Sequence, residues 1–193
     1  MVKKTLIFFI FIISTYLLGC SPVGLIASGG ATTMVVAEGD RSLGTVVDDT
    51  TIKINLSAKF LQADSNLFIN INTNVIDGRV LLTGIVENQE IRIEAVKTTW
   101  EISGVQEVIN EIQVGNKTTI KEYANDLWIN TQVKSLAAKT IGLRALSYNF
   151  ETIKGKVYIA GITSKPEQLQ KVIETTKTVK GVIEIINYVI IKE

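Results

Sequence analysis

The sequence predicts an α+β fold, an α/β sandwich made of two tandem copies of one αββαβ unit. Each copy is expected to be a small three-stranded sheet packed on two helices. Residues 77–84, DGRVLLTG, align with residues 154–161, KGKVYIAG, at an offset of 77, the separation of Gly78 from Gly155. The same offset pairs Asp49 with Asp126, and one register holds over about 60 residues without a gap. An internal duplication therefore explains most of the chain.

Each copy is expected to begin with an amphipathic helix. Apolar residues recur at helical spacing, with Ile52, Leu56 and Phe60 in the first copy and Ile129, Val133 and Leu136 in the second. Alternating apolar residues follow and predict a strand, with Leu67, Ile69 and Ile71 in the first copy and Leu146, Tyr148 and Phe150 in the second.

Tight turns and helix ends define the rest of each copy. The turns Asp77-Gly78 and Lys154-Gly155 predict hairpins leading into strands 79–85 and 156–162. Helices are expected over 88–102 and 165–179, and closing strands over 105–114 and 182–191. Six glycines are expected to have structural roles at turns and ends: Gly78, Gly84, Gly104, Gly155, Gly161 and Gly181.

The first residues have the pattern of an export signal. Lys3 and Lys4 precede an apolar run, 6–18, that ends at Gly19 and Cys20. Such a helix would cover roughly 20 Å, less than the roughly 30 Å of a bilayer core. We therefore expect a signal peptide over 1–19, a flexible tether over 20–46, a first domain over 47–115 and a second over 116–193.

The composition argues against catalysis. The chain has no histidine and one cysteine, which excludes the Ser-His and Cys-His nucleophile pairs and His/Cys metal clusters. Phosphate-binding and dinucleotide-binding motifs are absent from the sequence. We expect no catalytic residue, metal, cofactor or small-molecule substrate. The chain is close to neutral, with 20 basic and 19 acidic side chains, which argues against nucleic acid as a partner.

Charge divides unequally between the copies. Residues 47–115 hold ten acidic and five basic side chains, whereas 116–193 hold seven acidic and twelve basic ones. A domain of net charge +5 suggests binding to anionic phospholipid. The alternatives are that the two domains attract one another, or that lysine serves only solubility.

Trp128 strengthens the membrane interpretation. Its counterpart in the first copy is the polar Thr51, and it lies roughly 100° around the helix from the apolar stripe. An exposed tryptophan on a basic domain suits the headgroup region of a membrane. We expect a membrane contact formed by Leu127, Trp128, Lys134 and Lys139. The alternative is that Trp128 packs against the first domain. Trp100 of the first domain is expected to lie at the interface between the domains.

Two resemblances give these features a context. Leu17-Leu18-Gly19-Cys20 resembles the lipobox of bacterial lipoproteins, although Leu18 is larger than usual, and this implies that Cys20 carries acyl chains such as palmitate. Ser21 is not the aspartate that retains lipoproteins in the inner membrane, which favours the periplasmic face of the outer membrane.

The repeated unit itself resembles the BON domain, through its Asp/Lys-Gly-x-Val-x-Leu/Ile-x-Gly hairpin and its Gly-Val-x-x-Val/Ile-x-Asn close, over residues 48–192. The lead-in 41–45, RSLGT, is similar to that of dual-BON outer-membrane lipoproteins. The resemblance implies a non-catalytic protein that helps maintain the outer membrane, whose second domain contacts phospholipid through the helix of Trp128. The alternative is a periplasmic scaffold that recruits an envelope protein through the acidic first domain.

Overall fold

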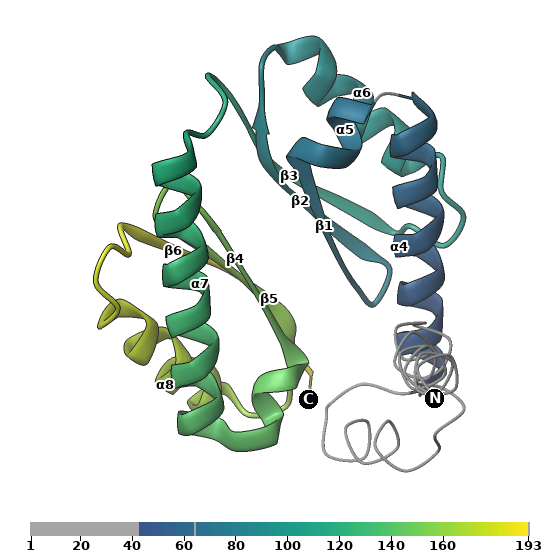
Figure 1. The fold of residues 1–193 in the computed structure, drawn as a ribbon. Helices are drawn as coiled ribbons and strands as arrows, with labels where there is room; N and C mark the ends of the chain where they lie inside the picture. Colours follow the sequence, from purple (N-terminus) through teal and green to yellow (C-terminus); the bar gives the residue numbers. More distant parts are fainter. Residues whose placement is uncertain (1–42, 64, 193) are drawn as a thin grey trace, which may run out of the picture. The chain divides into compact units, whose positions relative to one another are not determined.

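The computed structural model describes residues 43–63 and 65–192 (Figure 1). The expected signal peptide, Cys20 and most of the expected tether lie outside the described residues. The described residues belong to one compact unit.

Both copies have the same order of elements, which confirms the predicted fold class (Figure 1). The first copy consists of α4 (Leu43–Ala63), α5 (Ser65–Asn70), β1 (Ile71–Ile76), β2 (Arg79–Val86), α6 (Gln89–Trp100) and β3 (Glu107–Val114). The second consists of α7 (Ile120–Ile141), the 3₁₀ helix η1 (Gly142–Ser147), β4 (Tyr148–Ile153), β5 (Lys156–Thr163), α8 (Pro166–Lys177) and β6 (Glu184–Ile191).

Each copy contains a three-stranded mixed sheet with its hairpin at one edge. The strand orders are β1-β2-β3 and β4-β5-β6, with the first pair antiparallel and the second parallel in both sheets. The register is the same in both copies, since Ile71 pairs with Gly84 as Tyr148 pairs with Gly161. The parallel strands are joined through α6 or α8, which is the crossover that a parallel pair requires.

The helices cover one face of each sheet and complete its core. In the first copy Leu56 and Phe60 of α4 pack with Val80 and Leu82 of β2. In the second, Ile129 and Val133 of α7 pack with apolar residues of β4 and β5. The predicted helical stripes are therefore core residues, except that near the end of α7 Ala137 is buried and Leu136 only partly buried.

Two sequence predictions were wrong in detail. Leu67 and Ile69 lie in α5 and Leu146 lies in η1, not in strands, and both strands begin later than expected. In α5 Leu67 enters the core, while Phe68 and Ile69 are exposed. Helix α4 also begins at Leu43, within the range expected for the tether.

The other faces of the two sheets pack on one another. Their apolar cluster contains Ile76 and Leu81 of the first copy with Tyr158, Ala160 and Ile162 of the second. Two hydrogen bonds border the cluster: Gln113 donates to the Tyr158 hydroxyl at 3.3 Å, and the Tyr188 hydroxyl donates to Glu111. Trp100 is 53% exposed and is not part of this cluster, so its expected role at the domain interface was wrong.

Candidate functional site

Helix α7 carries the four residues expected to contact a membrane, and its first turn is fixed by a capping box. The Thr119 hydroxyl accepts from the backbone N–H of Glu122, and the Glu122 carboxylate accepts from the backbone N–H of Thr119 at 2.8 Å. The Thr119 hydroxyl also donates to the Glu122 carboxylate at 2.7 Å. The hydrogen bond from the Thr119 backbone, followed by the one from its hydroxyl, lowers the pKa of the Glu122 carboxyl group. The helix therefore has a defined start directly after the connector between the domains.

The structure places Trp128 outside the core. Its side chain is 47% exposed, and that of Leu127 is 54% exposed. Lys134 and Lys139 are also exposed, whereas Ile129 and Val133 are buried beneath the helix.

The four residues divide between two faces of α7. At about 100° per residue, Lys139 returns to within about 20° of Trp128, and Lys121 precedes Trp128 by the same angle. Leu127 lies about 100° away from Trp128 and shares its face with Ile120 and Lys134. Trp128 and Lys139 thus form one surface, and Leu127 and Lys134 belong to another.

The face with Leu127 borders a groove of about 520 Å³. One wall is α7 and the connector that precedes it, another is the end of β4, and the third comes from α5, β1 and β2 of the first copy. Four large exposed apolar side chains line it: Ile69, Ile120, Tyr123 and Leu127.

Hydrogen-bond acceptors line the same groove. Among the described residues, neither the Asn130 Oδ1 nor the Thr152 Oγ1 has a hydrogen-bond partner, and both atoms are buried. Glu151 accepts from the Asn72 amide at 3.1 Å, and burial raises the pKa of its carboxyl group. Sequence reasoning missed this groove because its walls come from both copies.

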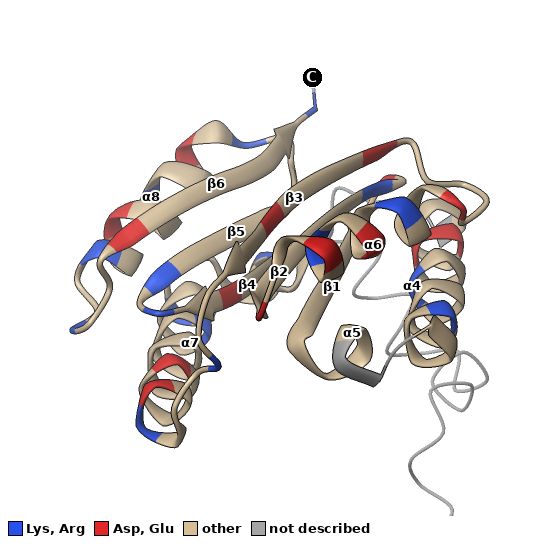
Figure 2. Cartoon of the chain, turned by 90° about the horizontal axis from the view of Figure 1, so that it is seen from above, with Lys and Arg blue, Asp and Glu red and all other residues tan. Residues whose placement is uncertain are grey.

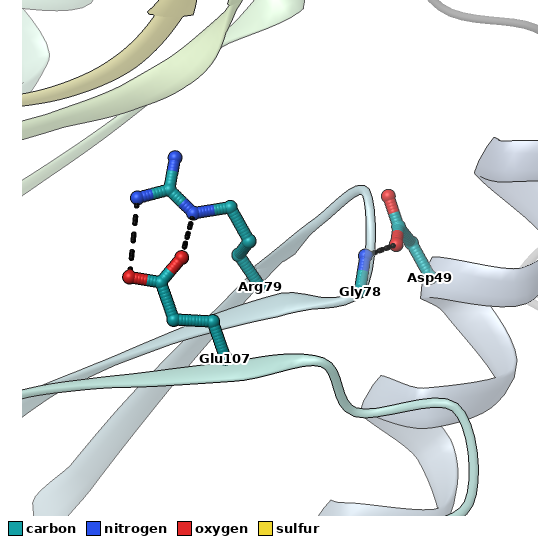
Figure 3. Close-up of polar contacts among 4 residues, drawn as sticks. All are labelled: Asp49, Gly78, Arg79 and Glu107. Carbon is teal, nitrogen blue, oxygen red and sulfur yellow. Dashed lines mark hydrogen bonds and ion pairs between the residues drawn. The ribbon is translucent and has the colours of Figure 1, made fainter.

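A buried carboxylate fixes the hairpin beside each helix. Asp49 Oδ1 accepts from the backbone N–H of Gly78 at 2.9 Å (Figure 3), and its Oδ2 accepts from that of Asp77 at 2.8 Å. In the second copy Asp126 accepts from Lys154 and Gly155 in the same way, at 2.7 and 2.9 Å. The recurrence of these two aspartates at the repeat offset is visible in the sequence, but the hydrogen bonds that they accept from the turn are not.

The hairpin glycines have the backbone that such turns require. Gly78 and Gly155 have φ of +74° and +76°, where a side chain would be strained. At Gly84 and Gly161 the neighbouring backbone is too close for a Cβ, which would lie 2.1 Å from the Asn70 oxygen and 2.5 Å from the Ser147 oxygen respectively. Gly104 and Gly181 follow α6 and α8 with φ of +92° and +94°.

Figure 2 shows that acidic and basic positions are mixed on the helices of both copies. Helices α4 and α6 each hold two acidic and two basic side chains, and α7 holds two acidic and three basic ones, so much of the positive charge of the second copy lies outside its helices. In each sheet an ion pair joins the two parallel strands at the same position of the repeat. Arg79 pairs with Glu107 (Figure 3), and Lys156 pairs with Glu184 at 2.6 Å.

None of the helices within residues 43–63 and 65–192 has the length and apolar content needed to cross a membrane. No group of three or more potential metal ligands gathers within those residues.

Two αββαβ units joined sheet to sheet define the class of protein by its fold. The family model described as BON domain matches residues 48–116 and 125–193. The chain therefore belongs to the BON-domain family.

Three relatives extend this result. The chain is 37% identical to the "Uncharacterized protein in gshII 5'region" of Anaplasma centrale, over 76% of this chain and 96% of that protein. It is 29% identical to the outer membrane lipoprotein DolP of Haemophilus influenzae, over 90% of each chain. It is 32% identical to a 21 kDa hemolysin of Actinobacillus pleuropneumoniae, over 77% of this chain and 78% of that protein. None of these names is that of an enzyme.

Proposed function

We propose that this chain is a non-catalytic lipoprotein of the outer membrane, anchored through Cys20 on the periplasmic face. Its second domain binds anionic phospholipid through α7, and this binding helps maintain outer-membrane integrity. The similarity to DolP over 90% of each chain supports the location. The observation that carries the binding proposal is the exposed Trp128 on a helix of a basic domain.

The surface of α7 around Trp128 suits a membrane interface. An indole ring combines an apolar body with one N–H donor, so it is stable at headgroup depth. Lys121 and Lys139 lie on the same side of the helix, about two turns before and about three turns after Trp128, and can meet lipid phosphates. Ala124 and Ser135 complete this side, so Trp128 is the main inserting group.

Vesicle sedimentation with residues 41–193 tests the proposal without the lipid anchor. Trp128→Ala should weaken binding to anionic vesicles by about 1 to 3 kcal/mol, because the ring no longer enters the headgroup region. The melting temperature should hardly change, since the side chain packs little in the fold. Added salt should weaken binding by the parent, because exposed charges are screened within about 8 to 10 Å.

Trp100→Ala is the matched control, since Trp100 is similarly exposed on the acidic first domain. It should leave vesicle binding unchanged. If Trp128→Ala instead destabilises the fold strongly and vesicle binding per folded molecule is unaffected, the tryptophan is a packing residue and the proposal fails.

A second candidate function is a scaffold that recruits an envelope protein through the first domain. One observation favours it: α4 exposes Val47, Ile54 and Leu61 at intervals of seven residues, which places them on one side of the helix. The second copy has Ala124, Thr131 and Ala138 at the equivalent positions. A chain of this kind would not sediment with anionic vesicles once the anchor is removed.

A further inference from the structure

The groove between α7, the end of β4 and the first copy is separate from the surface around Trp128. Leu127 lines the groove, but Trp128 does not, because the two side chains point about 100° apart on α7. The groove therefore requires an explanation of its own.

Apolar side chains form the mouth of the groove. Ile69, Ile120, Tyr123 and Leu127 are all more exposed than is usual for large apolar residues. Apolar side chains that gather around one concave site, rather than being scattered singly, indicate a surface that another molecule covers. The ligand must therefore have an apolar part.

The inner wall of the groove offers hydrogen-bond acceptors without donors. Thr152 is only 4% exposed, and its Oγ1 has no partner among the described residues. The Asn130 Oδ1, on the facing helix, is likewise buried and without a partner in that part of the chain. Buried polar atoms are nearly always hydrogen-bonded, so the Asn130 oxygen points to a group that donates, and the Thr152 hydroxyl can accept from the same group.

Glu151 adds negative charge to this wall. Its carboxylate accepts one hydrogen bond from Asn72 and takes part in none of the ion pairs found among the described residues. Lys134 and Lys53 favour its charged form from a distance, and Asp126 opposes it. Both Asp126 oxygens are already used by the hairpin, which leaves Glu151 as the available anion.

We propose that this groove binds a primary ammonium group joined to an apolar chain. The three N–H donors of the ammonium match the two unpartnered oxygens, and Glu151, on the opposite face of β4 from Thr152, favours its positive charge from a distance. The chain attached to it would lie against Ile120, Tyr123 and Leu127. A free alkylamine and the ethanolamine headgroup of a phospholipid both have this chemistry.

The acceptor set is particular to the second copy. At the positions equivalent to Asn130, Glu151 and Thr152, the first copy has Lys53, Asn74 and Val75. The sheet edge of the first copy therefore has the same backbone but none of these three side chains. Val75 is buried in β1 at the position that Thr152 occupies in β4. We therefore expect the fold to tolerate valine in place of Thr152.

The test uses the full-length chain in phosphatidylcholine nanodiscs, titrated with hexylamine and followed by amide NMR. Phosphatidylcholine has methyl groups in place of N–H donors, so the lipid itself does not compete. Hexylamine should shift the signals of Asn130 and Thr152, and should bind at least about tenfold more tightly than hexyltrimethylammonium or hexanol, the factor expected of one charge-assisted hydrogen bond. Equal binding of hexyltrimethylammonium would overturn the proposal.

Variants connect the binding to the groove. Thr152→Val and Glu151→Gln should each weaken hexylamine binding about tenfold, whereas Glu174→Gln, an exposed position on α8, should leave it unchanged. Unchanged melting temperatures establish that the variants fold. Parental affinity in both groove variants would also overturn the proposal.

A lipid arm distinguishes the two sources of the ammonium. If phosphatidylethanolamine is the source, discs that contain it should shift the groove signals without added amine and should weaken hexylamine binding by competition. If those discs behave like phosphatidylcholine alone, the site takes a free amine. Neither disc contains anionic lipid, so this result stands even if the role of Trp128 fails its own test.

Discussion

Asp49 and Asp126 show how one side chain can hold two elements together. Each lies on the first helix of its copy and accepts two backbone N–H groups from a hairpin turn 28 and 29 residues further on. Both are buried, so these turn donors have little access to water as an alternative partner. The pairing of the two aspartates at the repeat offset is visible in the sequence. Their bonds are not, because a turn donor can be satisfied by many residue types.

Asp49→Asn should destabilise the first domain by about 1 to 3 kcal/mol, because an amide has one acceptor oxygen and leaves one turn N–H unpaired. Chemical denaturation of residues 41–193 measures the loss. Asp48→Asn removes the same charge at the exposed neighbouring position and should have almost no effect. Equal effects of the two substitutions would mean that charge, not the two bonds, explains the role of Asp49.

At the scale of elements, the helices and strands with long patterns were predictable and the short ones were not. The apolar stripes of α4 and α7 extend over several helical turns, and the alternation in the hairpin strands extends over several residues. The helical and strand periods are therefore clear in the sequence. Leu67, Ile69 and Ile71 alternate over only five residues, which a short helix followed by a strand satisfies equally well. The groove could not be predicted, since it depends on how the end of β4 approaches residues of the first copy.

In each of the edge strands β3 and β6, an asparagine side chain occupies a backbone N–H of its own strand. Asn110 Oδ1 accepts from the backbone N–H of Ile112 at 3.1 Å, and Asn187 Oδ1 accepts from that of Val189 at 3.0 Å. A side chain that occupies an N–H at an open edge removes a donor that could pair with another chain. This gives a physical reason for the asparagine that closes both repeats.

Asn187→Val should therefore promote self-association through β6 while changing the stability of the monomer by about 1 kcal/mol or less. Light scattering on fractions from size-exclusion chromatography, over a range of concentrations, measures this. Asn187→Asp retains an acceptor oxygen and should remain as monodisperse as the parent. A monodisperse Asn187→Val chain would show that the edge is protected in another way.

At the scale of the whole molecule, the two sheets are joined by an apolar cluster bordered by tyrosines. Burial, followed by the hydrogen bond to Glu111, raises the pKa of Tyr188 from 10.0 to about 12. Burial also raises the pKa of Tyr158. Burial at the interface therefore favours the neutral form of both hydroxyls.

A tyrosine whose pKa is higher in the folded state stabilises the fold fully below its unfolded pKa, and that contribution is lost as pH rises through the folded value. The free energy of unfolding should thus fall between pH 10.0 and about 12. In Tyr188→Phe this part of the decline should be smaller, because no proton is lost at that position. Denaturation midpoints across the range measure both chains. Identical pH profiles would contradict the assignment.

The sheet-to-sheet cluster has a consequence for the origin of the duplication. Tyr158, Ala160 and Ile162 are almost fully buried only because the other copy covers them. An ancestral single unit with these residues would have displayed an adhesive apolar face and needed a twin from another molecule to hide it. Within one chain that twin is always present. With both inner faces covered, the outer helices are the parts that can differ between the copies without exposing the cluster, as the exposed Thr51 and Trp128 do at equivalent positions.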